Sequence, residues 1–322
     1  MIIDVHHHFI PGERIENIQK YLLPGQSVEK QGATMVVKDG KWRCFNLNRL
    51  YHSIEDQILH LDEGGIDMAV QTIGCYHDWT TGDVAPGIND AMAEIQAKYP
   101  RRVIGIAHVP PFDETAPREL ERCVKVLGLK GVTINTNTKG KYPDARAFAP
   151  LYRKVVELDI PIVVHAASLP GTEYMRKITR EGIESPALAR SIDHMIATMR
   201  IITGGVLKEF PSIKFIMGHL GGSGFFTLME RLGMNAGTQV FREITSHLFF
   251  DTAPVGWGKS TLACAIDTYG VDNVLMGSDY PAVVSDGSGL KKAVTAIKEL
   301  GLSPGNQAKI LGDTAENLFK LK

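Results

Sequence analysis

Residues 1–11 read MIIDVHHHFIP, in which a short apolar run ends in three consecutive histidines. The β-branched residues before the histidines favour a buried strand. A purification tag would be longer and would not continue such a strand, so we interpret the histidines as native to the fold. Side chains two residues apart on a strand share a face. His6 and His8 are therefore expected to converge on one point, while His7 faces away.

Seven more short runs rich in Val and Ile follow this one, and the segments between them have helical periodicity. This alternation is typical of βα units around a parallel sheet. Eight such units predict an α/β fold of the closed (β/α)₈ type, a TIM barrel. The expected strands are IIDVHH at 2–7, DMAVQTIG at 67–74, RVIGIAHV at 102–109, GVTINT at 131–136, PIVVHA at 161–166, IKFIMGH at 213–219, LFFDTA at 248–253 and NVLMGSDY at 273–280.

Residues 10–52 are too many for a simple loop after the first strand. Asp39-Gly40 lies within VVKDGKWRC, and this dipeptide between apolar residues is a strong hairpin signal because Gly takes the positive φ of a tight turn. We therefore predict a small β-hairpin insertion that caps one end of the barrel. No repeat of fixed period and no linker divides the chain, so residues 1–322 are expected to form one domain. A last helix over about 304–320 would pack on its outside.

Composition limits the classes of partner. The chain has 35 basic and 36 acidic residues and 44% hydrophobic residues, which gives no bulk attraction to nucleic acid or to an anionic membrane. No apolar run approaches the roughly 18 residues that span a bilayer. The four cysteines have no CxxC spacing, and no basic-then-apolar leader precedes the first strand. We expect a cytoplasmic protein with reduced thiols, without nucleic-acid or membrane partners.

Potential metal ligands stand at the ends of several expected strands. His165 ends the fifth strand and Asp279 the eighth, and the active sites of such barrels lie at the C-terminal ends of their strands. Together with His6 and His8 they offer three imidazoles and one carboxylate. This set suits Zn²⁺ or a similar divalent ion and is typical of a catalytic site with an open position. For His6 and His8 the alternative is a pair of satisfied core histidines.

Four motifs occur in a recognisable order along the chain: DVHHHFIP at 4–11, IVVHA at 162–166, IMGHLGGSG at 216–224 and MGSDYP at 276–281. With them the chain resembles the amidohydrolase superfamily, of the amidohydrolase 2 type, and within it the branch of 2-amino-3-carboxymuconate-6-semialdehyde decarboxylase and related metal-dependent decarboxylases. The resemblance runs over nearly the whole chain. It implies the barrel fold, removal of CO₂ from an unsaturated or aromatic carboxylic acid, and a homodimer.

The resemblance also implies residue roles. His6, His8, His165 and Asp279 match the ligands of one divalent metal ion, with Zn²⁺ expected first and Mn²⁺ second. His219 matches the histidine that stands beside the metal as acid or base, and Asp279 is the other candidate for proton transfer.

Further candidates surround this centre. Arg49 lies within one residue of the position at which the family carries a carboxylate-binding arginine in the insertion. His77 and Trp79, after the second strand, are candidates for lining the substrate pocket. The alternative for each is a solvated or packing role. Asp251, at the end of the seventh strand, is expected to orient a ligand imidazole from behind. The alternative for Asp251 is an aspartate that only caps its strand.

The same ligands also suit a hydrolase or hydratase of a lactone, amide or enol acid, since a fold does not select one reaction. A third alternative is a binding protein that has lost activity. Replacement of Asp279 by Asn separates the enzymes from the binder, because only an enzyme has turnover to lose.

Overall fold

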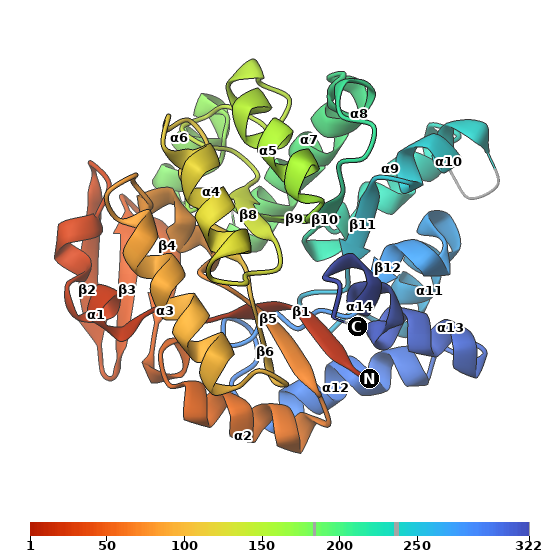
Figure 1. Cartoon of the computed structure of the whole chain (residues 1–322), viewed down its shortest axis with the longest axis horizontal. Helices are drawn as coiled ribbons and strands as arrows, with labels where there is room; N and C mark the ends of the chain where they lie inside the picture. Colours follow the sequence, from red (N-terminus) through yellow and green to blue (C-terminus); the bar gives the residue numbers. More distant parts are fainter. Residues whose placement is uncertain (183–184, 235–237, 322) are drawn as a thin grey trace.

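The computed structural model describes residues 1–182, 185–234 and 238–321. Each of the eight apolar runs contains a strand, and the strands lie in the interior with helices around them (Figure 1). The third run is interrupted at Ile106 and forms two short strands. The strands are β1 (Ile3–His8), β5 (Met68–Thr72), β6 (Val103–Gly105), β7 (Ala107–His108), β8 (Val132–Asn135), β9 (Ile162–His165), β10 (Phe215–Met217), β11 (Leu248–Asp251) and β12 (Val274–Leu275).

All pairings among these strands are parallel, as expected where helical crossovers connect them. They form two sheets, β1-β5-β6 and β7-β8-β9-β10-β11-β12, rather than one closed ladder. Backbone hydrogen bonds from Val5 N to Met276 O (3.0 Å) and from Asp279 N to His6 O (2.9 Å) bring the segment after β12 against β1. The fold is therefore α/β with parallel sheets, and the described residues do not show the closed ladder that the sequence predicts.

The helices follow the strands and cover them on the outside (Figure 1). None of the helices in the described ranges is long and apolar enough to cross a membrane. They are α1 (Gly12–Glu16), α2 (Ile54–Gly64), α3 (Ala85–Lys98), α4 (Ala116–Lys125), α5 (Ala149–Leu158), α6 (Glu173–Glu181), α7 (Pro186–Thr203), α8 (Val206–Glu209), α9 (Phe225–Arg231), α10 (Gln239–Thr245), α11 (Lys259–Tyr269), α12 (Gly287–Lys298), α13 (Pro304–Ala308) and α14 (Thr314–Leu318).

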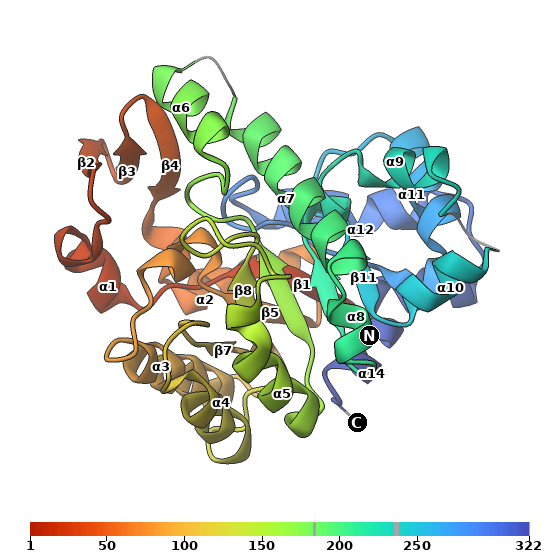
Figure 2. The same ribbon diagram turned by 90° about the horizontal axis from the view of Figure 1, so that it is seen from above.

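The expected last helix is present but interrupted, because a π-helical turn at Lys309–Asp313 joins α13 to α14. Gly312 in this turn lies against the start of the chain, where a Cβ would come within 2.1 Å of the Met1 carbonyl oxygen. Glycine is therefore needed for this close approach. The contact packs this turn against the start of the chain, and the two ends of the chain are neighbours (Figure 2).

Residues between β1 and α2 form an antiparallel sheet of three strands, β2 (Gln26–Gln31), β3 (Thr34–Asp39) and β4 (Trp42–Leu47). Asp39 pairs with Trp42 across a turn in which Gly40 has φ +59°. The sheet lies beside α6 (Figure 2), and the Arg180 guanidinium of α6 binds the Asp39 carboxylate through two hydrogen bonds of 2.6 and 2.7 Å. This contact fixes the sheet at the edge of the cavity described below.

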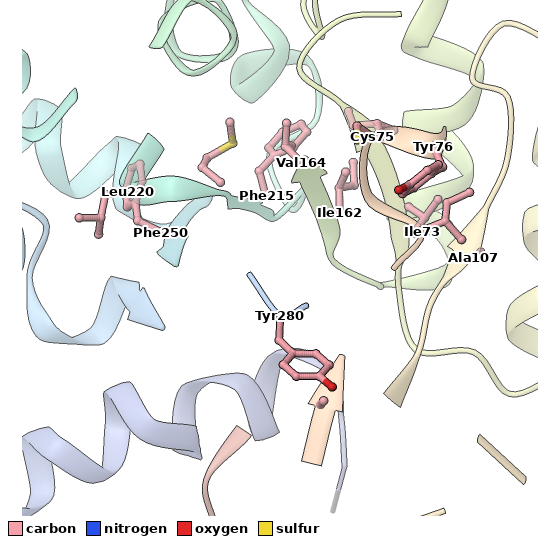
Figure 3. Close-up of a cluster of buried hydrophobic side chains, with 14 of the residues drawn as sticks. Ile73, Cys75, Tyr76, Ala107, Ile162, Val164, Phe215, Leu220, Phe250 and Tyr280 are labelled. Carbon is pink, nitrogen blue, oxygen red and sulfur yellow. The ribbon is translucent and has the colours of Figure 1, made fainter. Parts of the chain in front are cut away.

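The core has two parts. The larger cluster fills the space between strands and helices, and Figure 3 shows several of its side chains, among them Val164, Phe215 and Phe250. The smaller cluster combines strand residues such as Val5 and Val163 with Phe319, which follows α14. Apolar packing therefore fixes the strands on both sides and leaves their C-terminal ends for polar chemistry.

Candidate metal centre

Four ligand groups converge at the C-terminal ends of the strands. His6 and His8 come from β1, His165 from β9 and Asp279 from the segment after β12, and all four are buried. The potential ligand atoms lie within 4.8 Å of one another. The Nε2 atoms of His8 and His6 are 3.1 and 3.6 Å from Asp279 Oδ1. The four residues that the sequence singled out as ligands therefore lie around one point.

The orientation of the rings suits a cation. His6 Nδ1 lies 2.8 Å from Asp251 Oδ2, His8 Nδ1 lies 2.9 Å from Thr72 Oγ1, and His165 Nδ1 lies 2.9 Å from the Ala166 carbonyl oxygen. Each ring is thus held from behind and turns Nε2 to the centre. Among the described residues, the Nε2 atoms of His6 and His165 have no hydrogen-bond partner. Buried polar atoms without partners are rare, and this pattern of outer contacts is typical of metal-binding histidines.

The ladder between β1 and β5 shifts its register between Asp4 and His7. An extra residue of this kind re-aims the side chains that follow it, and such bulges are frequent beside active sites. The irregular stretch therefore includes His6 and lies just before His8, the two residues of β1 that meet at the centre.

The carboxylates near His6 favour the protonated, positively charged form of its imidazole. Burial lowers the pKa of His6, but the Asp251 carboxylate, with which it shares a hydrogen bond, and Asp279 raise it more, to about 9. Burial lowers the pKa of His8 and holds the pKa of His165 well below the usual value. Burial also raises the pKa of Asp279, but the hydrogen bond to His8 and the nearby imidazoles outweigh it and hold this pKa well below its usual range. An imidazolium therefore faces an ionised carboxylate at this point, and a cation can replace the proton.

Asp251 connects this centre to His219. Its Oδ2 contacts His6, and its Oδ1 accepts the backbone N–H groups of His219 (3.0 Å) and Ala253 (3.0 Å). The fully buried carboxylate thus contacts the His6 imidazole and also accepts backbone N–H groups at the end of β11.

His219 lies beside the ligands on a strained turn. Its ring centroid is 4.9 Å from that of His6, and its φ is +54°, in the left-handed region that non-glycine residues rarely adopt. Gly222 follows, and a Cβ there would come within 2.4 Å of the Ser191 carbonyl oxygen of α7. Burial lowers the pKa of His219, so its imidazole is neutral near pH 7. The sequence did not indicate that His194 of α7 packs against it, with 5.1 Å between the ring centroids.

A cavity of about 550 Å³ opens above these groups. His8, His165, His219 and Asp279 line it on one side, and its remaining wall combines aromatic and basic side chains. These wall residues include Phe45, Tyr51, Tyr76, Trp257, Arg43 and Arg190. The site can therefore place a planar molecule against a metal centre with a neutral histidine beside it.

Residues 3–321 match the family model described as Amidohydrolase. The chain belongs to this amidohydrolase family. It is 26% identical over 335 residues to a gamma-resorcylate decarboxylase of Polaromonas sp., with 99% of this chain and 98% of the relative covered. It is 25% identical over 297 residues to a 2-amino-3-carboxymuconate-6-semialdehyde decarboxylase of Dictyostelium discoideum, with 87% and 81% covered.

Among solved structures, the chain is similar to a dihydroxybenzoic acid decarboxylase of Polaromonas sp. JS666 with bound manganese and the inhibitor 2-nitroresorcinol. The TM-score is 0.75 at 23% identity, with 99% of this chain and 97% of the other covered. The match extends over the whole amidohydrolase fold.

Three residues that the sequence predicts to bind substrate lie outside the cavity of this amidohydrolase. The side chain of Arg49 is 71% exposed and pairs with Asp56 at 2.8 Å. His77 and Trp79 lie on a 3₁₀ segment, Gly74–Trp79, that separates two cavities at the C-terminal ends of the strands. Its Cys75 and Tyr76 line the metal-side cavity, whereas His77 and Trp79 line a second cavity of about 770 Å³.

Arg43 and Arg190 supply the positive charge in the metal-side cavity instead. Arg43 stands in the VVKDGKWRC stretch that indicated the hairpin, in the same insertion as Arg49. Arg190 is on α7, and its direction depends on how that helix is rotated against β4. Periodicity alone does not give this rotation.

Proposed function

We propose that this amidohydrolase is a metal-dependent decarboxylase, a carbon–carbon lyase that removes CO₂ from an unsaturated or aromatic carboxylic acid. The observation that carries the proposal is the group of four buried ligands, with imidazole Nε2 atoms turned to one point beneath an aromatic-walled cavity. The similarity to decarboxylases over nearly the full length supports the reaction class.

We assign one divalent ion to His6, His8, His165 and Asp279. Three imidazoles and one carboxylate suit Zn²⁺, our first choice, and Mn²⁺ is second because a solved neighbour carries manganese. When bound, the ion supplies Lewis acidity that stabilises the negative charge left by departing CO₂.

Side chains of this protein supply the proton that the reaction requires. Decarboxylation breaks the bond between the substrate carbon and its carboxylate, leaves the electron pair on that carbon and requires one proton there. His219 lines the cavity and is neutral at rest, so we assign it a role in two steps: its ring nitrogen first takes a proton from solvent or from an acidic group of the substrate, and the resulting imidazolium then delivers a proton to that carbon and returns to the neutral form. Asp279 is ionised, so it serves first as a ligand and can take a proton only after charge has developed.

We assign the binding of a second acidic or polar substrate group to Arg190. Its Nη2 donates to the Cys44 carbonyl oxygen, and its guanidinium lies 5.7 Å from the Trp42 ring centroid. Arg190 lines the cavity, where its guanidinium can bind an anion. A charge-assisted hydrogen bond is worth about 1.5–3 kcal/mol.

Arg190→Met is therefore expected to raise KM for the acid about 10- to 100-fold, with a smaller change in kcat. Arg49→Met is the matched control, because it removes the same charge from an exposed ion pair outside the cavity. Steady-state kinetics of both variants measures their KM and kcat for the acid. Equal KM values for the two variants would show that Arg190 does not bind the substrate.

The raised pKa of His6 gives a pH dependence of metal binding. Below its pKa of about 9 the imidazole is protonated, and the proton competes with the metal ion. Binding near neutral pH should release about one proton, and affinity should rise about tenfold per pH unit until about pH 9. Calorimetric titration in buffers of different ionisation enthalpy measures both quantities. Equal affinity at about pH 7 and about pH 8.5 would contradict this charge distribution.

The function is tested by measuring CO₂ release from a panel of aromatic and muconate-type carboxylic acids and lactones. The protein is stripped with a chelator and reloaded with Zn²⁺ or Mn²⁺. The proposal predicts CO₂ from at least one acid, only with metal and not with Asp279→Asn. Uptake of water by a lactone or enol acid without CO₂ would instead support the hydrolase or hydratase alternative.

We further propose that residues 1–322 act as one closed barrel domain with the sheet β2–β4 as its insertion. The backbone bonds between β1 and the segment after β12 support this closure. A homodimer in the cytoplasm is our proposal for the working state. Its cysteines are unpaired and three are buried, which suits a reducing compartment.

A further inference from the structure

The middle histidine of the triplet is turned away from the metal centre. His7 is fully buried, its Nδ1 lies 2.9 Å from Asp4 Oδ2, and its ring stacks on Tyr280 with centroids 4.5 Å apart and an interplanar angle of 15°. A buried imidazole is expensive unless it is bonded or packed. His7 is hydrogen-bonded through Nδ1 and packed through its ring, whereas its Nε2 has no partner among the described residues. Its two partners stand before and after the proposed ligands in the sequence.

Asp4 is the hub of these contacts. Its Oδ1 accepts the backbone N–H of His6 (3.1 Å) and of Ser278 (3.0 Å), and its Oδ2 accepts the Ser278 hydroxyl (2.5 Å). A carboxylate has no proton to donate, so His7 Nδ1 carries the hydrogen of their shared bond. One buried carboxylate therefore ties the strand of the histidines to the residue before Asp279.

Asp279 needs such support. Its φ is +62°, a left-handed conformation that non-glycine residues keep only where the surroundings over-determine it. Ser278 on one side is held by Asp4, and Tyr280 on the other side is held by the ring of His7. The Tyr280 hydroxyl also lies 2.8 Å from His60 Nδ1 of α2.

We propose that His7 and Asp4 are positioning residues that clamp both neighbours of Asp279 and so hold its carboxylate toward the metal. The inference rests on the proposed metal site and extends it to residues that touch neither metal nor substrate. It explains why three consecutive histidines occur, since the outer two bind the ion and the middle one fixes the fourth ligand.

The test is the affinity of chelator-stripped protein for Mn²⁺, measured by calorimetric titration. His7→Phe keeps an aromatic ring on Tyr280 but loses the bond to Asp4, and we expect Mn²⁺ to bind about 10- to 100-fold more weakly. Ser278→Ala removes the other side-chain donor to Asp4 with little change in volume, and it should weaken binding in the same direction. This second variant decides the question if His7→Phe does not fold.

His247→Phe is the matched control, because this buried histidine bonds the Ile213 carbonyl oxygen through Nδ1 (2.9 Å) and takes no part in the ligand cluster. It should lower the melting temperature without changing Mn²⁺ affinity. A merely structural role for His7 would give the same result as the control.

The outcomes separate the two claims. Mn²⁺ affinity within about twofold of wild type in both His7→Phe and Ser278→Ala would overturn the clamp and leave the metal site standing. A wild-type protein that binds Mn²⁺ but releases CO₂ from no acid would refute the decarboxylase alone. A wild-type protein that binds neither Mn²⁺ nor Zn²⁺ would overturn the metal site and the clamp together.

Discussion

Asp279→Asn is expected to lose about 10²- to 10⁴-fold in kcat and most of its metal affinity. The amide is nearly isosteric with the carboxylate, so the fold should persist. The substitution removes the negative charge that faces three imidazoles. A neutral amide oxygen is a poor replacement for a carboxylate ligand in such a site. Metal content by elemental analysis, together with steady-state kinetics, checks both parts.

Asp193→Asn is the control for this variant. Asp193 is also a buried carboxylate, but it accepts hydrogen bonds from Thr136 and Tyr142 instead of facing the ligands. The substitution should lower stability and leave the metal in place. If Asp279→Asn kept both full activity and full metal content, the ligand assignment would have to be abandoned.

The second large effect concerns His219. His219→Asn should keep the metal and lose about 10²- to 10⁴-fold in kcat, because it removes the proposed proton donor without touching a ligand. The contrast with Asp279→Asn is diagnostic, since one variant loses metal and activity while the other loses activity alone.

His77→Asn is the matched control for His219→Asn. The sequence placed His77 in the substrate pocket, but the structure places it at the second cavity. Its substitution should leave kcat unchanged. A larger loss of kcat in His77→Asn than in His219→Asn would show that chemistry takes place on the other side of the Gly74–Trp79 segment.

The convergence of the four ligands could be anticipated from sequence. Apolar β-branched runs mark the strands, and the C-terminal ends of parallel strands meet at one edge. Polar residues at those ends, such as His165 and Asp279, are therefore brought together although more than 100 residues separate them. Alternation along β1 separated His7 from its two neighbours for the same reason.

Features that depend on side-chain packing could not be read in this way. Arg49 pairs with Asp56 in the first turn of α2, and this ion pair holds its guanidinium at the surface. The division of the strand ends into two cavities depends on the path of residues 74–79, which carries no periodic signal. The contacts of Asp4 with Ser278 and of His7 with Tyr280 also join distant parts of the chain, and nothing local to the triplet indicates them.

The most direct measurement is mass spectrometry of the product formed by the metal-loaded enzyme in D₂O and, separately, in oxygen-18 water. The account predicts a product lighter by the mass of CO₂ that carries a solvent deuteron on the carbon from which CO₂ departed and no oxygen-18. A product that retains its carboxylate and gains oxygen-18 from water would contradict the decarboxylase account and would assign the same metal centre to hydrolysis or hydration.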